Sequence, residues 1–275
     1  MAIITVSREM GSGGQPIVQD FTSRLGYTLV DGNAIKTVAA KYGLTPEAIE
    51  TADEKPPAFV DRLDEKIELD AHIIELIILE YALEGNVVIY GRGAQDLLKD
   101  LKSVFRVRIV APFEERVERW AEREWIDPEM AHTLVRRSDQ QRAGFIKYYF
   151  DRDWANPLDY DLVINSSRLS EEMAAKLVCD GVQDANLVER KEESKRRLSE
   201  LIIKKKVQII LLKSEDIECL HINIEVADGH ISLDGHVHSD KELRAVIALV
   251  QQTEGVKSVK DKLKIIGYRT NPEDL

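Results

Sequence analysis

The chain has 275 residues, enough for one large or two modest domains, and its 44% hydrophobic and 32% charged residues are typical of a soluble protein. The net charge of −11 and a pI near 5.2 argue against a general nucleic-acid-binding protein, which needs a basic face, although a local basic pocket stays compatible with them. The sequence has no apolar run long enough to span a bilayer and no signal-peptide pattern. We therefore expect a cytoplasmic protein without a transmembrane segment.

The N-terminus predicts a phosphate-binding loop. A β-branched run, Ile3–Val6, is followed by the sequence Ser-Arg-Glu-Met-Gly-Ser-Gly-Gly-Gln and then by an amphipathic segment that begins with Pro16. Closely spaced glycines let successive backbone N–H groups converge at the N-terminus of the next helix, where anions bind. The standard motif G-x-x-x-x-G-K-[ST] is incomplete, because Gly14 stands at the lysine position and Gln15 at the Ser/Thr position. The alternative is a plain strand-to-helix turn.

Strands and helices then alternate through the first two-thirds of the chain. The expected strands are Ile3–Val6, Tyr27–Val30, Asn86–Tyr90, Val104–Ala111 and Leu162–Asn165. The expected helices are 15–25, 33–43, 58–84, 113–125, 128–149 and 170–187. Such alternation predicts an α/β fold, with a parallel sheet covered on both faces and with ligands at the carboxyl ends of its strands.

The pattern changes near residue 188. Residues 189–206 are dense in charges of both signs at helical spacing, which favours a solvated connecting helix over a basic recognition patch. Two alternating segments joined by Asp228-Gly229 then predict a β-hairpin. An amphipathic helix over 239–253 and a strand over 256–266 complete a small α+β unit. Cys179 and Cys219 lie far apart in apolar-patterned segments and read as reduced, buried thiols.

Residues 1–187 resemble the cytidylate kinase-like family, a branch of the nucleoside monophosphate kinases. The resemblance rests on the following segments: Thr5 to Glu9, Gly11 to Gly14, Leu29 to Asp31, Gly91 to Ala94, Arg137-x-Asp139-x-x-Arg142, and Asp159 to Asn165. Members of this branch commonly carry Gly-Gly where a standard loop has Gly-Lys. They usually have a basic residue at the position of Gln15, and in this respect the chain departs from the family pattern.

The resemblance implies a P-loop kinase-like domain with a helical lid that transfers the γ-phosphate of ATP to a nucleoside monophosphate, with CMP or dCMP as first candidates. ATP is the expected cofactor, with Mg²⁺ as a candidate companion ion. The residues expected to bind it are Arg8, Gly11, Ser12, Gly13, Gly14 and Gln15. The missing hydroxyl at Gln15 predicts weak metal affinity.

Arginines are candidates to replace the missing lysine, since a planar guanidinium binds phosphate oxygens bidentately. Arg92, Arg137 and Arg142 are the expected catalytic residues, and the last two belong to the lid that the resemblance implies. Each could instead be a solvated surface charge. Asp31, Arg92 and Asp139 are the expected substrate-binding residues, and Asp31 could instead cap the following helix.

Residues 200–268 resemble a BON domain, on the pattern of alternating apolar residues from Ile222 to Val237 and on Gly255-Val256-x-x-Val259-x-x-x-Leu263. BON domains are often periplasmic and are implicated in phospholipid or partner binding. With no export signal, the resemblance implies an intracellular binding or assembly module. We therefore expect a nucleotide-binding domain (1–187), a charged helical linker (188–205) and a BON-like domain (206–268).

The histidines of the last segment give a weaker pattern. His236 and His238 share one strand face, and His221 could be their neighbour, so three imidazoles could hold zinc. Surface histidines on an edge strand are the commoner arrangement, and neither an adjacent carboxylate nor a cysteine spacing supports a metal site. We therefore predict none.

Three functions follow from these patterns. The first is a nucleoside monophosphate kinase fused to a BON module. The second is a catalytically inactive nucleotide sensor that reports occupancy to a protein or lipid partner through that module. In the third, the module forms a homo-oligomer and the kinase fold is a scaffold. The glycines and arginines favour the kinase, and the altered loop favours the other two.

Overall fold

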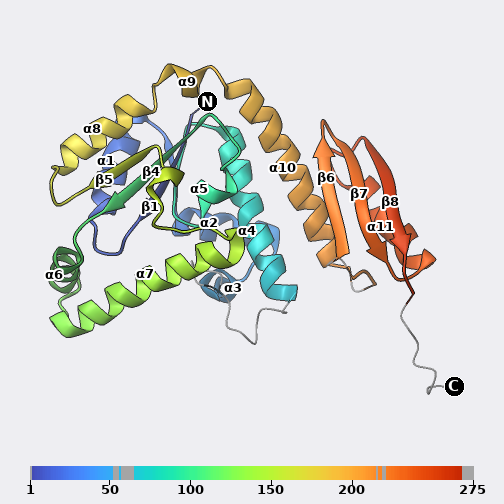
Figure 1. Ribbon diagram of the computed structural model, residues 1–275, viewed down its shortest axis with the longest axis horizontal. Helices are drawn as coiled ribbons and strands as arrows, with labels where there is room; N and C mark the ends of the chain where they lie inside the picture. Colours follow the sequence, from blue (N-terminus) through green and yellow to red (C-terminus); the bar gives the residue numbers. More distant parts are fainter. Residues whose placement is uncertain (1, 52–55, 57–64, 215, 219–220, 268–275) are drawn as a thin grey trace.

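The computed structural model describes residues 2–51, 56, 65–214, 216–218 and 221–267. A five-stranded sheet with helices on both faces forms the larger part, and a three-stranded sheet forms a C-terminal module (Figure 1). The strands are β1 (Ile3–Arg8), β2 (Thr28–Val30), β3 (Val87–Tyr90), β4 (Val104–Val110), β5 (Leu162–Asn165), β6 (Ile222–Ala227), β7 (His230–Val237) and β8 (Ser258–Ile265).

The α-helices are α1 (Gly14–Leu25), α2 (Gly32–Ala39), α3 (Pro46–Thr51), α4 (Glu65–Glu84), α5 (Ala94–Leu97), α6 (Phe113–Glu124), α7 (Pro128–Phe150), α8 (Glu171–Gly181), α9 (Ala185–Val188), α10 (Lys191–Leu212) and α11 (Asp240–Gln252). Ala40–Tyr42 and Pro157–Asp159 form short 3-10 helices. The expected strands are present, with shifted ends, and so are most of the long helices. The helix expected over 170–187 is divided into α8 and α9, and the one expected over 33–43 continues from α2 into a 3-10 turn. The short helices α3 and α5 were not expected, and residues 58–64 of the helix expected over 58–84 lie outside the described residues.

The large sheet is parallel throughout, with strand order β2-β3-β1-β4-β5. Successive residues of β1 serve opposite faces: Ile3 packs with α2, α4 and α10, whereas Ile4 packs with α1 and α8. This arrangement confirms the predicted α/β fold. It brings the loops that follow β1, β3 and β4 to one edge of the sheet.

The C-terminal module is a mixed sheet of order β6-β7-β8, in which β6 is antiparallel and β8 parallel to β7. One face packs on the second half of α10 and on α11. Val207 and Leu211 of α10, and Val246 and Val250 of α11, are buried there. The small α+β fold is therefore confirmed.

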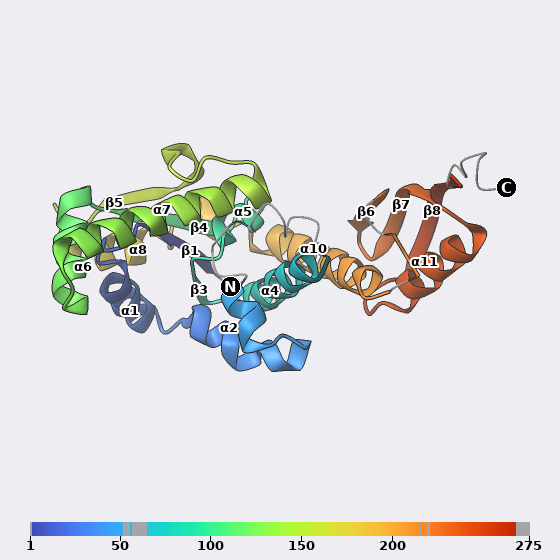
Figure 2. The ribbon, with the colours of Figure 1, turned by 90° about the horizontal axis from the view of Figure 1, so that it is seen from below.

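Helix α10 joins the two parts and is more than a solvated connection. In both ribbon views it lies beside α4 before it reaches the small sheet (Figures 1 and 2). Leu198 is buried in the larger core, although it falls in the segment expected to be a solvated linker. Ile202 is buried there too, in line with the apolar face that Ile202, Ile203, Val207, Ile210 and Leu211 form in the sequence. Burial of each apolar side chain contributes roughly 1.5–3 kcal/mol, which outweighs the exposed charges on the other faces of the helix. The domain limits given above remain a proposal.

An ion pair also links α4 to α10. The Lys205 ammonium contacts the Glu75 carboxylate, and His72 lies 3.2 Å from the same oxygen. Burial opposes ionisation of Glu75, but the hydrogen bond from His72 and the charge of Lys205 outweigh it and lower its pKa to about 2.

We expect Glu75→Gln to lower the free energy of unfolding by on the order of 2 kcal/mol at pH 7. The folded-state pKa is below the ordinary value of 4.5, so this stabilisation is complete above pH 4.5 and is lost as the pH falls toward 2. Denaturant unfolding of parent and variant across this pH range measures the gap between their free energies of unfolding. Glu68→Gln, on the exposed side of the same helix, is the control. A gap that stayed constant below pH 4.5 would contradict the assignment.

Two smaller findings complete the fold. Cys179 is a free, half-buried thiol, whose pKa is raised by burial, and Cys219 lies outside the described residues. Among the helices of the described residues, none combines the length and the apolar character needed to cross a membrane.

Candidate functional site

The glycine-rich loop between β1 and α1 has the conformation that the sequence predicts. Gly11 and Gly13 have φ values of +78° and +70°, and Gly13 is the N-cap of α1. A Cβ at Gly11 would lie 2.4 Å from the carbonyl oxygen of Arg116 in α6, so only glycine fits. Gly14 is helical, but a Cβ there would lie 3.3 Å from the Cβ of Arg8. The loop thus presents the N-terminus of α1 to any bound anion.

This loop forms one wall of a pocket of about 210 Å³. Its lining residues are Arg8, Glu9, Met10, Gly11, Ser12, Gly13, Gly14, Gln15, Pro16, Tyr90, Trp120, Arg123 and Arg142. All six residues expected to bind the cofactor are among them. The lining also carries three arginines from three elements, β1, α6 and α7, against the single carboxylate of Glu9.

Two polar atoms of pocket residues have no hydrogen-bond partner among the described residues. They are the buried hydroxyl oxygen of Ser12 and the buried indole nitrogen of Trp120. A buried polar group left unpaired costs about 1–3 kcal/mol, so an oxygen-rich ligand at this position would remove that cost. Glu9, in contrast, is already used: its carboxylate lies 3.4 Å from both Arg108 and Arg116. The pocket therefore suits a polyanion such as a nucleotide phosphate chain.

A second, very small pocket adjoins the first through Arg8 and Arg142, which line both. Arg8 packs its guanidinium 4.3 Å from the centre of the Tyr90 ring, and Arg142 donates a 2.7 Å hydrogen bond to Ser138 of its own helix. These contacts orient two long side chains toward one region. Arg8 and Arg142 are thus the two expected residues that the structure brings together most directly.

Arg92 and Asp31 come together elsewhere, at the N-terminus of α2. Arg92 is 8% exposed and has a φ of +61°, between Gly91 and Gly93, which are also left-handed. A Cβ at Gly32 would lie 3.2 Å from a guanidinium nitrogen of Arg92, so the side chain reaches α2. The Asp31 carboxylate accepts hydrogen bonds from the amides of Asn33 and Ala34, as the capping alternative predicts.

Asp139 and Arg137 differ from the expected roles. One carboxylate oxygen of Asp139 accepts from the Met10 amide at 3.1 Å and the other from Arg116 at 2.7 Å. Its oxygens are engaged by the protein, so it positions the loop between β1 and α1. Arg137 is exposed on α7 and does not line the pocket. It is five residues from Arg142, which is one full turn plus about 140°, so the two arginines lie on different faces of the helix.

A buried polar cluster lies at the ends of β1 and β4. The guanidinium of Arg108 stacks 4.2 Å from the Trp154 ring centre and contacts the hydroxyls of Ser7 and Tyr160 at 3.3 and 3.4 Å. The indole of Trp154 donates to Ser7 at 2.8 Å. Burial raises the pKa of Tyr160, while its contacts with Ser7 and Arg108 oppose the rise. Trp154 therefore packs the segment after α7 onto the sheet.

Several residues of the site were not predicted. Trp120 and Arg123 come from α6, and Tyr90 ends β3. A signal was available in α6, where Arg116, Arg119 and Arg123 follow each other at spacings of three and four after a strand that ends at the ligand edge. Arg119 hydrogen-bonds Ser166, whose hydroxyl donates to the carbonyl of Ser12.

We expect Asp139→Asn to weaken nucleotide binding about tenfold, since loss of a charge-assisted hydrogen bond costs roughly 1.5–3 kcal/mol and frees the Met10 amide. Calorimetric titration with an ATP analogue measures the effect. Asp151→Asn, an exposed carboxylate paired with Lys147 near the other end of α7, is the matched control. Equal affinity in Asp139→Asn and the parent would show that the carboxylate does not position the loop.

The parallel sheet, the glycine-rich loop after β1 and the arginines around it define a protein of the P-loop kinase class. Residues 3–168, more than half of the chain, match the model of the cytidylate kinase-like family, and the chain belongs to this family. Residues 199–267 match the model of the BON domain. Both resemblances noted in the sequence are confirmed.

Relatives with a named activity cover the same part of the chain. The cytidylate kinase of Pyrococcus horikoshii is 32% identical over 198 residues, which are 69% of this chain and 96% of that protein. The cytidylate kinase of Natronomonas pharaonis is 30% identical over 171 residues, 62% of this chain and 83% of that protein. An uncharacterized protein from Eubacterium ventriosum, of known crystal structure, superposes with a TM-score of 0.52 at 20% identity, over 67% of this chain and 99% of that one. This last similarity concerns the fold alone.

Proposed function

We propose that this protein is a nucleoside monophosphate kinase that transfers the γ-phosphate of ATP to CMP or dCMP. The observation that carries the proposal is the pocket in which the loop from Gly11 to Gly14 meets Arg8, Arg123 and Arg142. Membership of the cytidylate kinase-like family supports the reaction class. The names of the relatives support cytidine nucleotides as the first acceptors to test.

The proposed roles follow from the chemistry of phosphoryl transfer, which needs positioning and positive charge more than covalent help. The amides of the loop would hold the phosphate chain of ATP at the N-terminus of α1. Arg8 and Arg142, at the junction of the two pockets, would neutralise charge on the transferring phosphoryl group. Arg92, at the N-terminus of α2, would serve the acceptor side.

The side chains that line this site do not form a set of ligands for Mg²⁺. Gln15 offers no hydroxyl, Asp31 caps α2, and Glu9 is paired with two arginines. Mg²⁺ keeps several waters and is commonly held by phosphate oxygens, so any ion here would come with the nucleotide. ATP fits the residues present better than the metal does.

The alternative is a nucleotide sensor without catalysis, favoured by Gly14 and Gln15 at the positions of lysine and Ser/Thr. In that case the BON module would signal to a protein or lipid partner whether nucleotide is bound. In the scaffold alternative, the module would hold copies of the chain together. A cytoplasmic location fits either function and is part of the proposal.

A coupled assay of ADP formation with a panel of nucleoside monophosphates tests the proposal. We expect turnover with CMP and dCMP that exceeds turnover with AMP, GMP and UMP. A calorimetric ATP titration of the same protein accompanies the assay. ATP binding without turnover of any monophosphate would overturn the kinase proposal and favour the sensor.

A further inference from the structure

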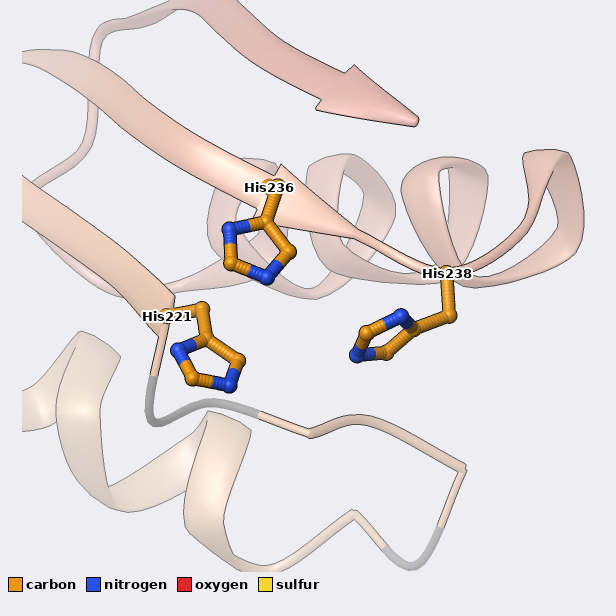
Figure 3. Close-up of side chains that lie close together, drawn as sticks. All are labelled: His221, His236 and His238. Carbon is orange, nitrogen blue, oxygen red and sulfur yellow. The ribbon is translucent and has the colours of Figure 1, made fainter. Parts of the chain in front are cut away.

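Three of the six histidines gather at one end of the small sheet (Figure 3). His221 directly precedes β6, His236 lies in β7, and His238 follows β7. One ring nitrogen of each lies within 4.8 Å of the other two. The rings of His221 and His236 stack with centroids 4.3 Å apart, and that of His238 stands edge-on to them at 6.2 and 5.5 Å.

The strand pairing produces this cluster. Ile222 pairs with Gly235, so the next antiparallel pair places His221 opposite His236. Gly235 has a φ of +123°, and a Cβ on it would lie 1.9 Å from the carbonyl oxygen of His221. His236 and His238 flank the buried Val237 and lie on the other face of the strand. β7 is the central strand, so the expectation of surface histidines on an edge strand is wrong for these two.

A carboxylate stands beside the cluster, although none was visible in the sequence pattern. An oxygen of Glu218 lies 3.0 Å from Nε2 of His238. Nδ1 of His238 lies 2.8 Å from the carbonyl oxygen of Ile266, which can only accept, so Nδ1 carries the proton. In the neutral ring, Nε2 then turns a lone pair toward a carboxylate. Two acceptors at this separation need a cation, either a second proton on the ring or a metal ion between them.

The backbone around these ligands is fixed by a buried carboxylate. Glu242, in the first turn of α11, is 7% exposed. One of its oxygens accepts from the amide of Glu218 at 2.9 Å and the other from the amide of His238 at 2.7 Å. Glu242 therefore holds the backbone of Glu218 close to the backbone of His238. The hydrogen bond from Nδ1 of His238 to the carbonyl of Ile266 also orients the ring, as is typical of imidazoles that bind metals.

We propose that His221, His236, His238 and Glu218 form a binding site for a zinc-type divalent metal ion in the C-terminal module. Neutral imidazoles with one carboxylate are a common ligand set for such ions. Ligand atoms of a tetrahedral zinc ion lie about 3.3 Å apart, given Zn–N bonds of about 2.0–2.1 Å. The nitrogens of the three imidazoles need to close by at most about 1.5 Å. Glu218 is near this separation from His238 and would complete the ligand set from that side. The ion would tie the start of β6, the end of β7 and the segment before β6 together.

Calorimetric titration of the chelator-treated full chain with Zn²⁺, without nucleotide, tests the site. We expect one ion per chain. We also expect Co²⁺ to give the visible absorption of a tetrahedral complex. His236→Gln and His238→Gln should each weaken binding by about 100-fold or more, and Glu218→Gln by about tenfold. His230→Gln is the matched control, because His230 lies exposed on the same strand and pairs with Ser258, away from the cluster.

A second readout separates ligand loss from misfolding. Zinc should raise the midpoint of thermal unfolding of the parent and of His230→Gln, but not of His236→Gln. Without metal, His236→Gln should unfold at the midpoint of the parent, because no ligand is then lost. Zinc binding by His236→Gln as tight as by the parent would overturn the proposal. So would an absence of saturable binding by the parent. Half an ion per chain with dimerisation would also overturn it, in favour of a site between two copies.

Discussion

Replacement of Arg142 by alanine is expected to lower phosphoryl-transfer turnover on the order of 10³-fold, the smaller end of what a transition-state arginine contributes. Arg142 lines both pockets and donates a hydrogen bond to Ser138 of its own helix. Arg142→Lys should recover part of the rate, since it keeps the charge and loses the bidentate geometry.

The measurement is kcat with saturating ATP and CMP, accompanied by denaturant unfolding of each variant. Arg136→Ala, exposed on the same helix and outside the pocket lining, is the matched control and should keep the parent rate. Arg92→Ala should lose a similar factor in turnover, with an added stability loss of about 1 kcal/mol because a largely buried side chain is removed. Parent activity in Arg92→Ala and Arg142→Ala would remove both arginines from the site.

Substitution of Gly13 by valine is expected to abolish ATP binding while the fold is kept. Gly13 is the N-cap of α1 with a φ of +70°, and the nearest atom to an added Cβ would be a nitrogen of Arg119 at 3.8 Å. The side chain has room in the folded protein, so the main structural cost is the left-handed backbone, roughly 1–2 kcal/mol. The branched side chain would, however, stand where phosphate must approach the loop amides.

Gly26→Val provides the control for this substitution. Gly26 ends the same helix with a φ of +65° and has no atom within 4 Å of an added Cβ. Both variants should lose similar unfolding free energy, whereas only Gly13→Val should lose ATP binding by calorimetry. Equal ATP affinity in both would mean that the loop amides do not hold the phosphates.

Local sequence determined much of the fold. The β-branched runs, the glycines at positive φ and the Asp-Pro start of α7 act over a few residues, so strands, loop and helix ends follow from neighbours in the chain. Helix α10 was misjudged for the same reason. Its charges dominate the local pattern, while the partner that buries Leu198 and Ile202 is α4, more than a hundred residues earlier.

The site divides in the same way. The sequence by itself determined the glycine-rich loop, because Arg8, Ser12 and the glycines all lie in the short segment from Arg8 to Gly14. Only the tertiary structure decided which distant residues join it. Packing of α6 and α7 at the sheet edge brought Arg123 and Arg142 to the pocket and turned Asp139 toward Met10 and Arg116, while Arg137 was left exposed. Strand register likewise decided that His221 and His236 lie opposite each other, since cross-strand neighbours are set by the sheet and not by spacing along the chain. The contact of Glu218 with His238 also depends on tertiary structure, because Glu242 of α11 holds the backbone of both residues.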